Sequence, residues 1–433
     1  MDKSITEKRA GLSRRDFVKA SAAAGLAAVA PGASRVYAAG SDKIRVGLIG
    51  CGGRGTHDTG NCLKCAENVE LVAMGDLLED RLRSSRARLT KTQPDKVKVS
   101  DETCFVGWDA CDKVVSLPQV DLVVLTTPPH FRPMQLKAAI EAGKHVFMEK
   151  PVAVDPVGVR SVIASSELAD QKNLTILAGT QMRKIAHLME GVRRIHDGQI
   201  GSLAGGQCVR IGGGMTSWGP RPRQAGWSDM EWQLRRWLFM TWLSGDFIAE
   251  MHVHNLDIVN WAFGSHPVQC IGMGGRQVRT APEFGNVYDH FAVEYEYPNG
   301  VRVEYMGAQT DRVSDRNDQW IVGTRGKAYL DFANAIIEGD NPFRYDGPSW
   351  NPELKQHADQ ISAIRENKRL NEGKRIAESS LTSIMGRMSA YTGRALKWDW
   401  AMKASKLDLS PEKYEFGPLE MRPVAIPGQT PLV

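Results

Sequence analysis

The chain has 433 residues, of which 42% are hydrophobic and 24% are charged. These values are typical of a globular protein of roughly two or three domains, and they exclude collagen-like repeats, low-complexity disorder and a small disulfide-rich scaffold. The formal net charge is +5, but +4 of it falls in residues 1–38, which hold seven Lys and Arg against three Asp and Glu. The near-neutral remainder gives no reason to expect nucleic acid or an anionic membrane as a partner.

The first forty residues have the pattern of an export signal. Arg14 and Arg15, with a serine before them and an aromatic residue and a lysine after them, match the twin-arginine motif. The alanine-rich stretch that follows, residues 20–30, is shorter than the roughly 20 residues that a membrane-spanning helix needs. We therefore expect residues 1–38 to be a twin-arginine signal peptide of a periplasmic protein without a membrane span. The alternative is a cytoplasmic protein with an unusual N-terminal helix.

The next segment combines a strand, a glycine-rich turn and a helix. An apolar run at 44–49 predicts the strand, and a helix is expected at 56–67. The turn between them fits G-x-G-x-x-G, in which glycine allows a sharp turn, close approach of a pyrophosphate and close packing of the helix. The N-terminus of that helix directs free N–H groups at the phosphates. We therefore expect a dinucleotide here, in contact with Gly50, Gly52, Gly53, Arg54 and Gly55.

The residue that would select the dinucleotide follows the second predicted strand, residues 70–74. Asp76 lies 26 positions after Gly50, close to the spacing of an acid that accepts hydrogen bonds from the ribose hydroxyls. Because a carboxylate at this point repels a 2′-phosphate, we expect NAD as the cofactor. Arg81 and Arg83 keep NADP as the alternative.

Strands and helices alternate from here to residue 178, which indicates a doubly wound parallel sheet. The predicted strands are 120–125, 145–148 and 174–178, and the predicted helices are 134–142 and 156–169. Ligands bind beyond the carboxyl ends of the strands in such sheets. The residues expected at the cofactor in these loops are Thr126, Thr127, Pro128, His130, Glu149 and Lys150.

After a helix at 186–197 the pattern changes to short alternating runs, which predict a second domain with a large, mostly antiparallel open sheet. The runs are 209–212, 268–272, 290–297, 301–306, 320–322 and 327–332. Two docking helices are expected at 357–370 and 375–391. The predicted division is a signal peptide 1–38, a Rossmann domain 41–153, an α+β substrate and oligomerisation domain 154–400 and an irregular tail 401–433.

Three motifs at these separations resemble the glucose-fructose oxidoreductase/inositol dehydrogenase (Gfo/Idh/MocA) family. They are the glycine turn, Thr127-Pro128 and Glu149-Lys150-Pro151, and the resemblance runs from about residue 44 to about residue 391. It implies that Lys150 stands beside the nicotinamide and the substrate hydroxyl, and that Gln181 and Arg183 enter the cleft at the cofactor and the substrate. It also implies a homodimer or homotetramer formed through the open sheet. Arg132 departs from the family, where many members carry a histidine.

The densest group of reactive side chains lies at residues 245–257. On a helix, Glu250 and His254 share a face, and Asp257 is also adjacent to His254. A carboxylate can fix the tautomer of the imidazole while the other ring nitrogen meets a substrate hydroxyl. The family resemblance implies a pattern Asp-x-x-x-His-x-x-Asp here, with Glu250 in place of the first acid. We expect Lys150, His254 and Glu250 to be catalytic, with Glu250 orienting His254 or binding a neighbouring hydroxyl, and His252 and Asp257 to bind substrate.

A metal site is the rival interpretation of this segment, because His252, His254, Glu250 and Asp257 are all ligand-type residues. On a helix, however, positions two apart point about 200° apart, so the two histidines cannot readily hold one ion. We therefore expect no metal.

A segment rich in tryptophan and arginine, residues 215–242, precedes this cluster. Aromatic faces and hydrogen-bonding arginines suit polyhydroxylated rings, which present apolar C–H faces and hydroxyl edges. Trp218 and Trp227 are expected to bind substrate, whereas Trp232 and Trp237 are expected in the core. Ordinary packing of all four is the alternative.

Together these features predict an exported NAD(P)-dependent oxidoreductase that oxidises a secondary alcohol of a sugar, cyclitol or sugar derivative. Lys150 and His254 would form the acid–base pair. Because the periplasm offers no established pool of free NAD, the cofactor is expected to be tightly bound. One alternative is an NAD-dependent glycoside-cleaving enzyme that works by transient oxidation and elimination. Another is a non-catalytic sugar sensor that keeps the nucleotide as a structural ligand.

Overall fold

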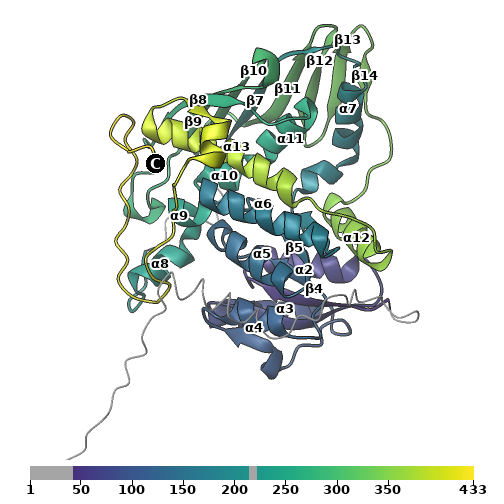
Figure 1. Ribbon diagram of the computed structural model, residues 1–433, viewed down its shortest axis with the longest axis vertical. Helices are drawn as coiled ribbons and strands as arrows, with labels where there is room; N and C mark the ends of the chain where they lie inside the picture. Colours follow the sequence, from purple (N-terminus) through teal and green to yellow (C-terminus); the bar gives the residue numbers. More distant parts are fainter. Residues whose placement is uncertain (1–41, 214–221) are drawn as a thin grey trace, which may run out of the picture.

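The computed structural model describes residues 42–213 and 222–433. The predicted signal peptide and Trp218 lie outside these residues. The described chain forms two sheets with helices packed against them, and the long helix α13 (Gly373–Thr392) lies between the two sheets (Figure 1).

The first sheet has parallel strands in the order β3-β2-β1-β4-β5-β6. The strands are β1 (Ile44–Ile49), β2 (Val69–Asp76), β3 (Cys104–Val106), β4 (Leu122–Leu125), β5 (His145–Met148) and β6 (Ile176–Ala178). The helices are α2 (Gly53–Lys64), α3 (Glu79–Thr92), α4 (Ala110–Ser116), α5 (Arg132–Glu141) and α6 (Pro156–Gln171). β4 is buried throughout, as expected where helices cover both faces. The predicted doubly wound parallel sheet is confirmed, and its order reverses between β1 and β4, where ligands bind in such folds.

This sheet extends past the domain boundary predicted at residue 153. α6 and β6 form one more helix–strand unit, and β6 pairs in parallel with β5. The three residues of β6 are apolar and buried, so they complete the first core rather than begin a second one. The parallel sheet therefore reaches Ala178.

The second sheet has the order β14-β13-β12-β11-β7-β10-β9-β8-β15. Its strands are β7 (Leu203–Gly212), β8 (Gln269–Gly275), β9 (His290–Glu296), β10 (Arg302–Gln309), β11 (Arg316–Gly323), β12 (Gly326–Asp331), β13 (Ala335–Gly339), β14 (Phe343–Arg344) and β15 (Leu396–Lys397). Only the β7–β10 pair among these described strands is parallel, so the mostly antiparallel sheet is confirmed. Alternate residues of β10 are buried, which leaves one face of the sheet packed and the other open.

Most helices of this half lie on the packed face of the sheet or beside the cavity described below. The helices are α7 (Ala186–His196), α8 (Asp229–Arg235), α9 (Thr241–Ser244), α10 (Phe247–Glu250), α11 (Val253–Phe263), α12 (Pro352–Arg365), α13 and α14 (Trp398–Lys403). Of these, α12 and α14 pack against α2 and α6 of the first half. α13 is buried on nearly every side because it packs against both α6 and β8.

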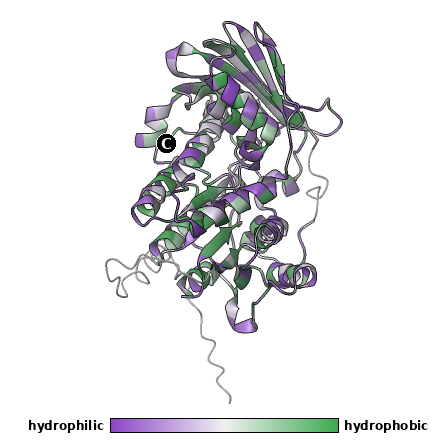
Figure 2. Cartoon of the chain, turned by 90° about the vertical axis from the view of Figure 1, so that its right-hand side faces the viewer, coloured by the Kyte–Doolittle hydropathy of each residue, from purple (hydrophilic) through white to green (hydrophobic). Residues whose placement is uncertain are grey.

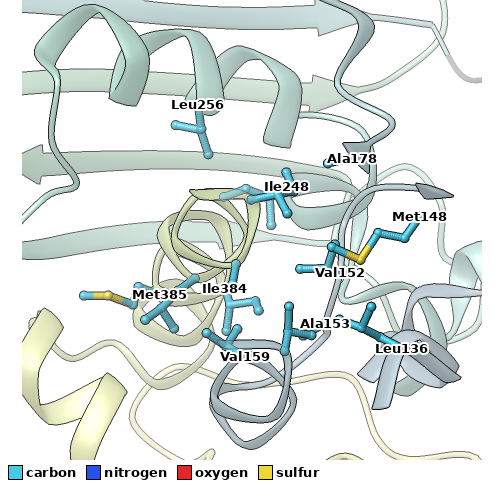
Figure 3. Packing of buried hydrophobic residues seen from close by; sticks show 14 of the residues in the cluster. Leu136, Met148, Val152, Ala153, Val159, Ala178, Ile248, Leu256, Ile384 and Met385 are labelled. Atoms are coloured by element: carbon cyan, nitrogen blue, oxygen red, sulfur yellow. The ribbon is translucent and has the colours of Figure 1, made fainter. Parts of the chain in front are cut away.

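One hydrophobic core joins the two halves. Figure 3 shows Ile384 and Met385 of α13 beside Val159 of α6, with Ile248 of α10 and Leu256 of α11 in the same cluster. Because a continuous apolar core crosses from one sheet to the other, the elements that line the space between them are held in fixed positions.

The segment after α14 has no helix or strand and runs down the side of the molecule towards α8 (Figure 1). It is attached to the first half by Leu409, whose N–H donates to Asp155 Oδ2 at 2.8 Å, and by Tyr414, whose hydroxyl is 2.8 Å from His130 Nε2. Figure 2 shows the apolar residues gathered on the strands inside the first half, with mixed colours on the surrounding helices. None of the helices in residues 42–213 and 222–433 has the length and apolar composition that a bilayer crossing requires.

Candidate active site

A cavity of about 670 Å³ lies at the carboxyl edge of the parallel sheet, between the two halves of the chain. One wall is made by the turn after β1, the end of β2 and the loops after β4 and β5, and the facing wall by β7, α10 and α11. Cofactor and small-molecule sites usually have ~300–1,000 Å³, so this space is of the right size for such a ligand.

The glycine turn has two kinds of glycine. Gly50 has a φ of +94°, and a Cβ on it would lie 2.5 Å from the Thr127 nitrogen. A Cβ on Gly55 would lie 2.0 Å from the Gly50 carbonyl oxygen, so Gly55 is required for packing α2 on β1 and does not line the cavity. A Cβ on Gly53 would meet nothing within 4 Å, and both Gly52 and Gly53 line the cavity at the start of α2. The turn thus leaves open space at a helix N-terminus, where dinucleotide phosphates bind.

Asp76 lines the cavity at the end of β2, where a ribose is expected. Its Oδ2 accepts from the Cys51 N–H at 2.5 Å and its Oδ1 from the Leu78 N–H at 2.8 Å. Burial raises the pKa of Asp76, and the two backbone N–H groups oppose that rise. The carboxyl group is fixed in position with lone pairs left for ribose hydroxyls. Arg81 lines the same end of the cavity.

The loop after β4 is fixed by its own hydrogen bonds. The Thr126 hydroxyl donates to the Gly50 carbonyl at 2.7 Å, and the Thr127 hydroxyl donates to Gln135 Oε1 at 2.6 Å. Both threonines and Pro128 line the cavity, as predicted. This loop and the glycine turn are therefore locked together at the point where the strand order reverses.

Arg54 and Glu149 line the cavity as predicted, but they bind each other. Arg54 Nη2 lies 2.8 Å from Glu149 Oε1, Nε lies 3.1 Å from Asp58 Oδ1, and Nη1 lies 3.0 Å from Glu353 Oε1 on α12. Burial and the neighbouring Glu149 raise the pKa of Asp58 well above its usual value. This network joins α2, β5 and α12 beneath the cavity floor.

The two halves meet in an ion pair between predicted catalytic residues. Lys150 follows β5, and its Nζ donates to the Glu250 carbonyl at 2.6 Å and lies 3.1 Å from Glu250 Oε1 at the end of α10. The side chains are 12% and 13% exposed, and both line the cavity. The ammonium is held at the cavity surface and retains a further N–H for a ligand.

His254, in the first turn of α11, lines the same wall. Its Nδ1 is buried with no hydrogen-bond partner among the described residues, whereas Nε2 remains open to the cavity. Burial, with Lys150 and Arg210 nearby, lowers the pKa of His254 well below its usual value. The imidazole is therefore neutral at physiological pH and can accept a proton. Helix α10 ends at Glu250 before α11 begins, and Glu250 contacts Lys150 instead of His254.

Gln181, in the short helix η4 (Gln181–Lys184) after β6, also lines the cavity. Its Oε1 is buried with no hydrogen-bond partner in the part of the chain that the structure describes. A buried acceptor without a donor costs free energy unless a ligand supplies one. The residues present therefore fit a dinucleotide: open glycines at a helix N-terminus, an aspartate at the ribose position and an unsatisfied amide.

The structure places His252, Asp257 and Arg183, which are predicted to bind substrate, outside the lining of the cavity. His252 is 1% exposed and its Nδ1 lies 2.6 Å from the Tyr305 hydroxyl. Asp257 is bound by Arg183 at 2.7 Å and Arg375 at 3.0 Å, and these contacts hold its pKa below the usual range despite burial. Asp257 therefore fixes α11 to η4 and α13, and it does not orient His254. His252 is bonded to Tyr305, whereas His254 faces the cavity, so the two imidazoles have different surroundings.

His130 and Trp227, which are predicted at the cofactor and the substrate, also lie outside the cavity lining. His130 is buried and bonded to Tyr414 of the C-terminal segment. Trp227 stacks on Trp232, with ring centroids 6.5 Å apart, and Arg235 lies over its face. The C-terminal segment provides the partner of His130, and α8 provides the partners of Trp227.

Two arginines in the cavity wall were missed as ligand-binding residues. Arg210 lies on β7, and Arg132 begins α5. Arg210 lies in an apolar stretch of its strand. A charged residue in such a stretch is the only feature of the sequence that indicates a role for Arg210 in the cavity. Arg132 was noted only as a departure from the family pattern.

A second, smaller cavity of about 220 Å³ lies behind α11 and is lined by Arg183 and Arg375 among others. Both arginines donate hydrogen bonds to the Asp257 carboxylate. No group of three His, Cys, Asp or Glu side chains within residues 42–213 and 222–433 is arranged to hold a metal ion.

Comparison with known proteins gives curated relatives over part of the chain. A Glycosyl hydrolase family 109 protein of Solibacter usitatus is 34% identical over 152 residues, 33% of this chain and 33% of the relative. The Myo-inositol 2-dehydrogenase of Thermotoga maritima is 25% identical over 231 residues, 53% of this chain and 58% of the relative. The chain spans about half the length of the first curated relatives it matches.

The solved structure of aldose-aldose oxidoreductase from Caulobacter crescentus has the same fold. The TM-score is 0.65 at 18% identity, and the match covers 82% of this chain and 99% of that one. Two family models match the chain. Residues 44–180 match the oxidoreductase family with an NAD-binding Rossmann fold, and residues 193–329 match the GFO/IDH/MocA C-terminal domain. Since family models match both halves of the molecule in order, this chain belongs to the Gfo/Idh/MocA family.

Proposed function

We propose that the chain is an NAD-dependent oxidoreductase that oxidises a secondary alcohol of a sugar, cyclitol or sugar derivative. The observation that carries this proposal is the convergence of Lys150, Glu250 and His254, from both halves of the chain, on one cavity that also contains Gly52 and Gly53. A nucleotide sensor has no need of an ammonium, a carboxylate and a neutral imidazole on one wall.

The residues that would hold NAD are Gly52 and Gly53 for the phosphates, Asp76 for a ribose, and the loop of Thr126 and Thr127. When bound, the nicotinamide supplies the hydride acceptor. Within residues 42–213 and 222–433, no Lys or Arg lies within ion-pair distance of the Asp76 carboxyl group, and this favours NAD over NADP because a 2′-phosphate would be repelled.

The proton chemistry follows from the state of each side chain. The neutral His254 accepts the hydroxyl proton through Nε2 as the carbon–hydrogen bond breaks. Lys150 donates a hydrogen bond to the same oxygen and stabilises the negative charge that develops on it. Glu250 holds the Lys150 ammonium in place through two contacts, at 2.6 and 3.1 Å.

A second candidate function is glycoside cleavage by transient oxidation and elimination. The similarity to a Glycosyl hydrolase family 109 protein favours this alternative. The same acid–base pair would serve it, because oxidation acidifies the neighbouring C–H bond and the cofactor is regenerated in the last step.

A sugar and cyclitol panel on the NAD-loaded chain tests the proposal. Growth of reduced-nicotinamide absorbance without bond cleavage supports the dehydrogenase. Release of an aglycone with NAD unchanged in amount supports the cleaving enzyme. Binding of a sugar with neither change in wild type would support the sensor and refute both enzymes.

We also propose export and self-association. The twin arginines at 14 and 15 support export to the periplasm, where a tightly bound cofactor would be required. Met273 and Met306 are 72% and 37% exposed, and both pair with Ala292 across the open face of the sheet. This apolar stripe supports a homodimer or homotetramer through that face. Replacing both arginines by lysine should leave the protein in the cytoplasm, and Met273→Asp should yield smaller assemblies in light scattering.

A further inference from the structure

We infer that the substrate carries a carboxylate and that Arg210 binds it. The inference rests on the proposed function, in that the cavity beside His254 is taken as the substrate site. It goes further by naming a sugar acid as the class of substrate and Arg210 as the residue that selects it.

The position of Arg210 is fixed by neighbours that leave most of its guanidinium unused. Nη1 donates to the Met251 carbonyl at 2.6 Å and to Asn255 Oδ1 at 3.2 Å, and Asn255 in turn donates to Asn317 at 2.7 Å. Nε and Nη2 have no hydrogen-bond partner among the described residues. These two nitrogens form one edge of the planar fork, which matches the two oxygens of a carboxylate.

Arg210 is also without a counter-ion. No carboxylate in residues 42–213 and 222–433 lies within ion-pair distance of it. Burial lowers the pKa of Arg210, and the Glu250 carboxylate, which is paired with Lys150, opposes that shift. A buried guanidinium that lacks a counter-ion costs free energy unless a ligand compensates it. An anion at this position would supply that compensation.

The charge balance of the cavity wall supports the same conclusion. Lys150 is paired with Glu250, and Arg54 is paired with Glu149. Arg210 and Arg132 remain unbalanced within the described chain. Arg132 is 1% exposed, and burial lowers its pKa to about 10. The charged side chains that line the cavity are five Arg and Lys (54, 81, 132, 150 and 210) and four Asp and Glu (76, 112, 149 and 250), a formal net charge of +1. An anionic ligand would neutralise this charge at the arginines that have no ion pair.

Arg210 lies on the substrate side of the cavity rather than with the expected phosphates. It belongs to β7 of the second half, and its charge lowers the pKa of His254. The open glycines that suit phosphates are at the start of α2, on the first half. A carboxylate bound by Arg210 would therefore be close to the hydroxyl that His254 deprotonates.

The test uses matched sugars and calorimetry on the NAD-loaded full chain. The probes are D-glucuronate and D-galacturonate against D-glucose and D-galactose, with Arg210→Gln, Arg210→Lys and the control Arg344→Gln. Arg344 is exposed on β14 of the same sheet. We expect at least one acid to bind about tenfold or more tightly than its neutral counterpart. Arg210→Gln should weaken the binding of that acid by about 10- to 100-fold and the binding of the neutral sugar by less than about threefold. Arg210→Lys should retain part of the preference, and Arg344→Gln all of it.

Three results with the sugars would overturn the inference, and a fourth concerns NAD. They are equal or tighter binding of the neutral sugars by wild type, absence of binding by either acid, and equal losses for acid and neutral sugars in Arg210→Gln. If Arg210→Gln weakens the binding of NAD instead of the acid, Arg210 binds the cofactor and the inference is wrong. If Arg210→Gln does not fold, the preference of the wild-type chain for an acid over its neutral sugar decides whether the substrate carries a carboxylate.

Failure of the proposed function has a different signature. It would appear as sugar binding without any change in the nicotinamide or any cleavage of the sugar. Calorimetry reports on Arg210 in either case.

Discussion

Replacement of Lys150 by Met separates the chemistry of the proposed acid–base pair from its contribution to stability. Methionine keeps the length of the side chain and removes the ammonium. A positioned acid–base group typically contributes about 10²–10⁴-fold to the rate, or about 3–5 kcal/mol of barrier. We expect kcat to fall by that factor, with NAD affinity changed less than about threefold because the phosphate and ribose contacts are made elsewhere.

The same replacement leaves Glu250 without its partner. Both side chains are only 12–13% exposed, and loss of one member of a buried pair costs about 3–5 kcal/mol. Because Glu250 lines a cavity that water can enter, we expect a smaller loss of unfolding free energy, about 1–3 kcal/mol. The double variant Lys150→Met/Glu250→Gln removes the uncompensated charge, so it should regain most of this stability and none of the activity.

Single-turnover reduction of bound NAD and urea unfolding measure the two effects. Arg344→Gln, an exposed substitution on β14, serves as the control for both. The reasoning is refuted if Lys150→Met turns over within about tenfold of wild type, or if the double variant recovers activity together with stability.

Three further predictions, tested by four substitutions, concern the packing around the site. Asp257→Asn should cost about 3 kcal/mol in urea unfolding, because Arg183 loses its counter-ion and Arg375 keeps only Glu372. Since the pKa of Asp257 is depressed, this stability is present at neutral pH and is lost as the pH falls below about 4. The assignment would be contradicted if the loss of stability below pH 4 were the same in the variant as in wild type. His357 is buried, and burial lowers its pKa to about 3. Below about pH 6.5 the unfolded state therefore binds more protons than the folded state, and the free energy of unfolding should fall by about 2 kcal/mol between pH 6.5 and 5. His357→Leu should reduce this dependence of stability on pH, as measured by thermal unfolding at a series of pH values. Gly55→Ala should impair folding because the added Cβ would meet the Gly50 carbonyl. Gly53→Ala should keep the melting temperature of wild type and bind NAD less tightly. Equal behaviour of the two variants in melting temperature and NAD binding would show that the turn does not bind phosphate.

Buried strands were the most predictable part of the fold. β5 matches the predicted range 145–148 because Val146, Phe147 and Met148 form an apolar run between clear turn signals. β7 begins at Leu203, six residues before the predicted start, because its first half is rich in glycine and gives no alternation. α3 was not predicted, since only Leu82, Ser85 and Leu89 of its fourteen residues are buried. A mostly polar helix leaves little periodic signal.

In the candidate site, residues in motifs were predictable and residues that depend on distant partners were not. Lys150 and His254 follow from motif and spacing, and the structure places both at the cavity. Asp257 is three positions from His254, but its partners come from η4 and α13, far along the chain. Arg210 reaches the cavity only because β7 pairs in parallel with β10 and in antiparallel fashion with β11, which local sequence does not specify.

A crystal structure of the NAD-loaded Lys150→Met variant with a bound substrate tests the central claim most directly. We predict that one substrate hydroxyl lies within hydrogen-bond distance of His254 Nε2 and beside the side chain at position 150, with its carbon facing the nicotinamide. A substrate bound with its reactive carbon turned away from His254, or a nicotinamide outside the cavity that Lys150 lines, would contradict the account.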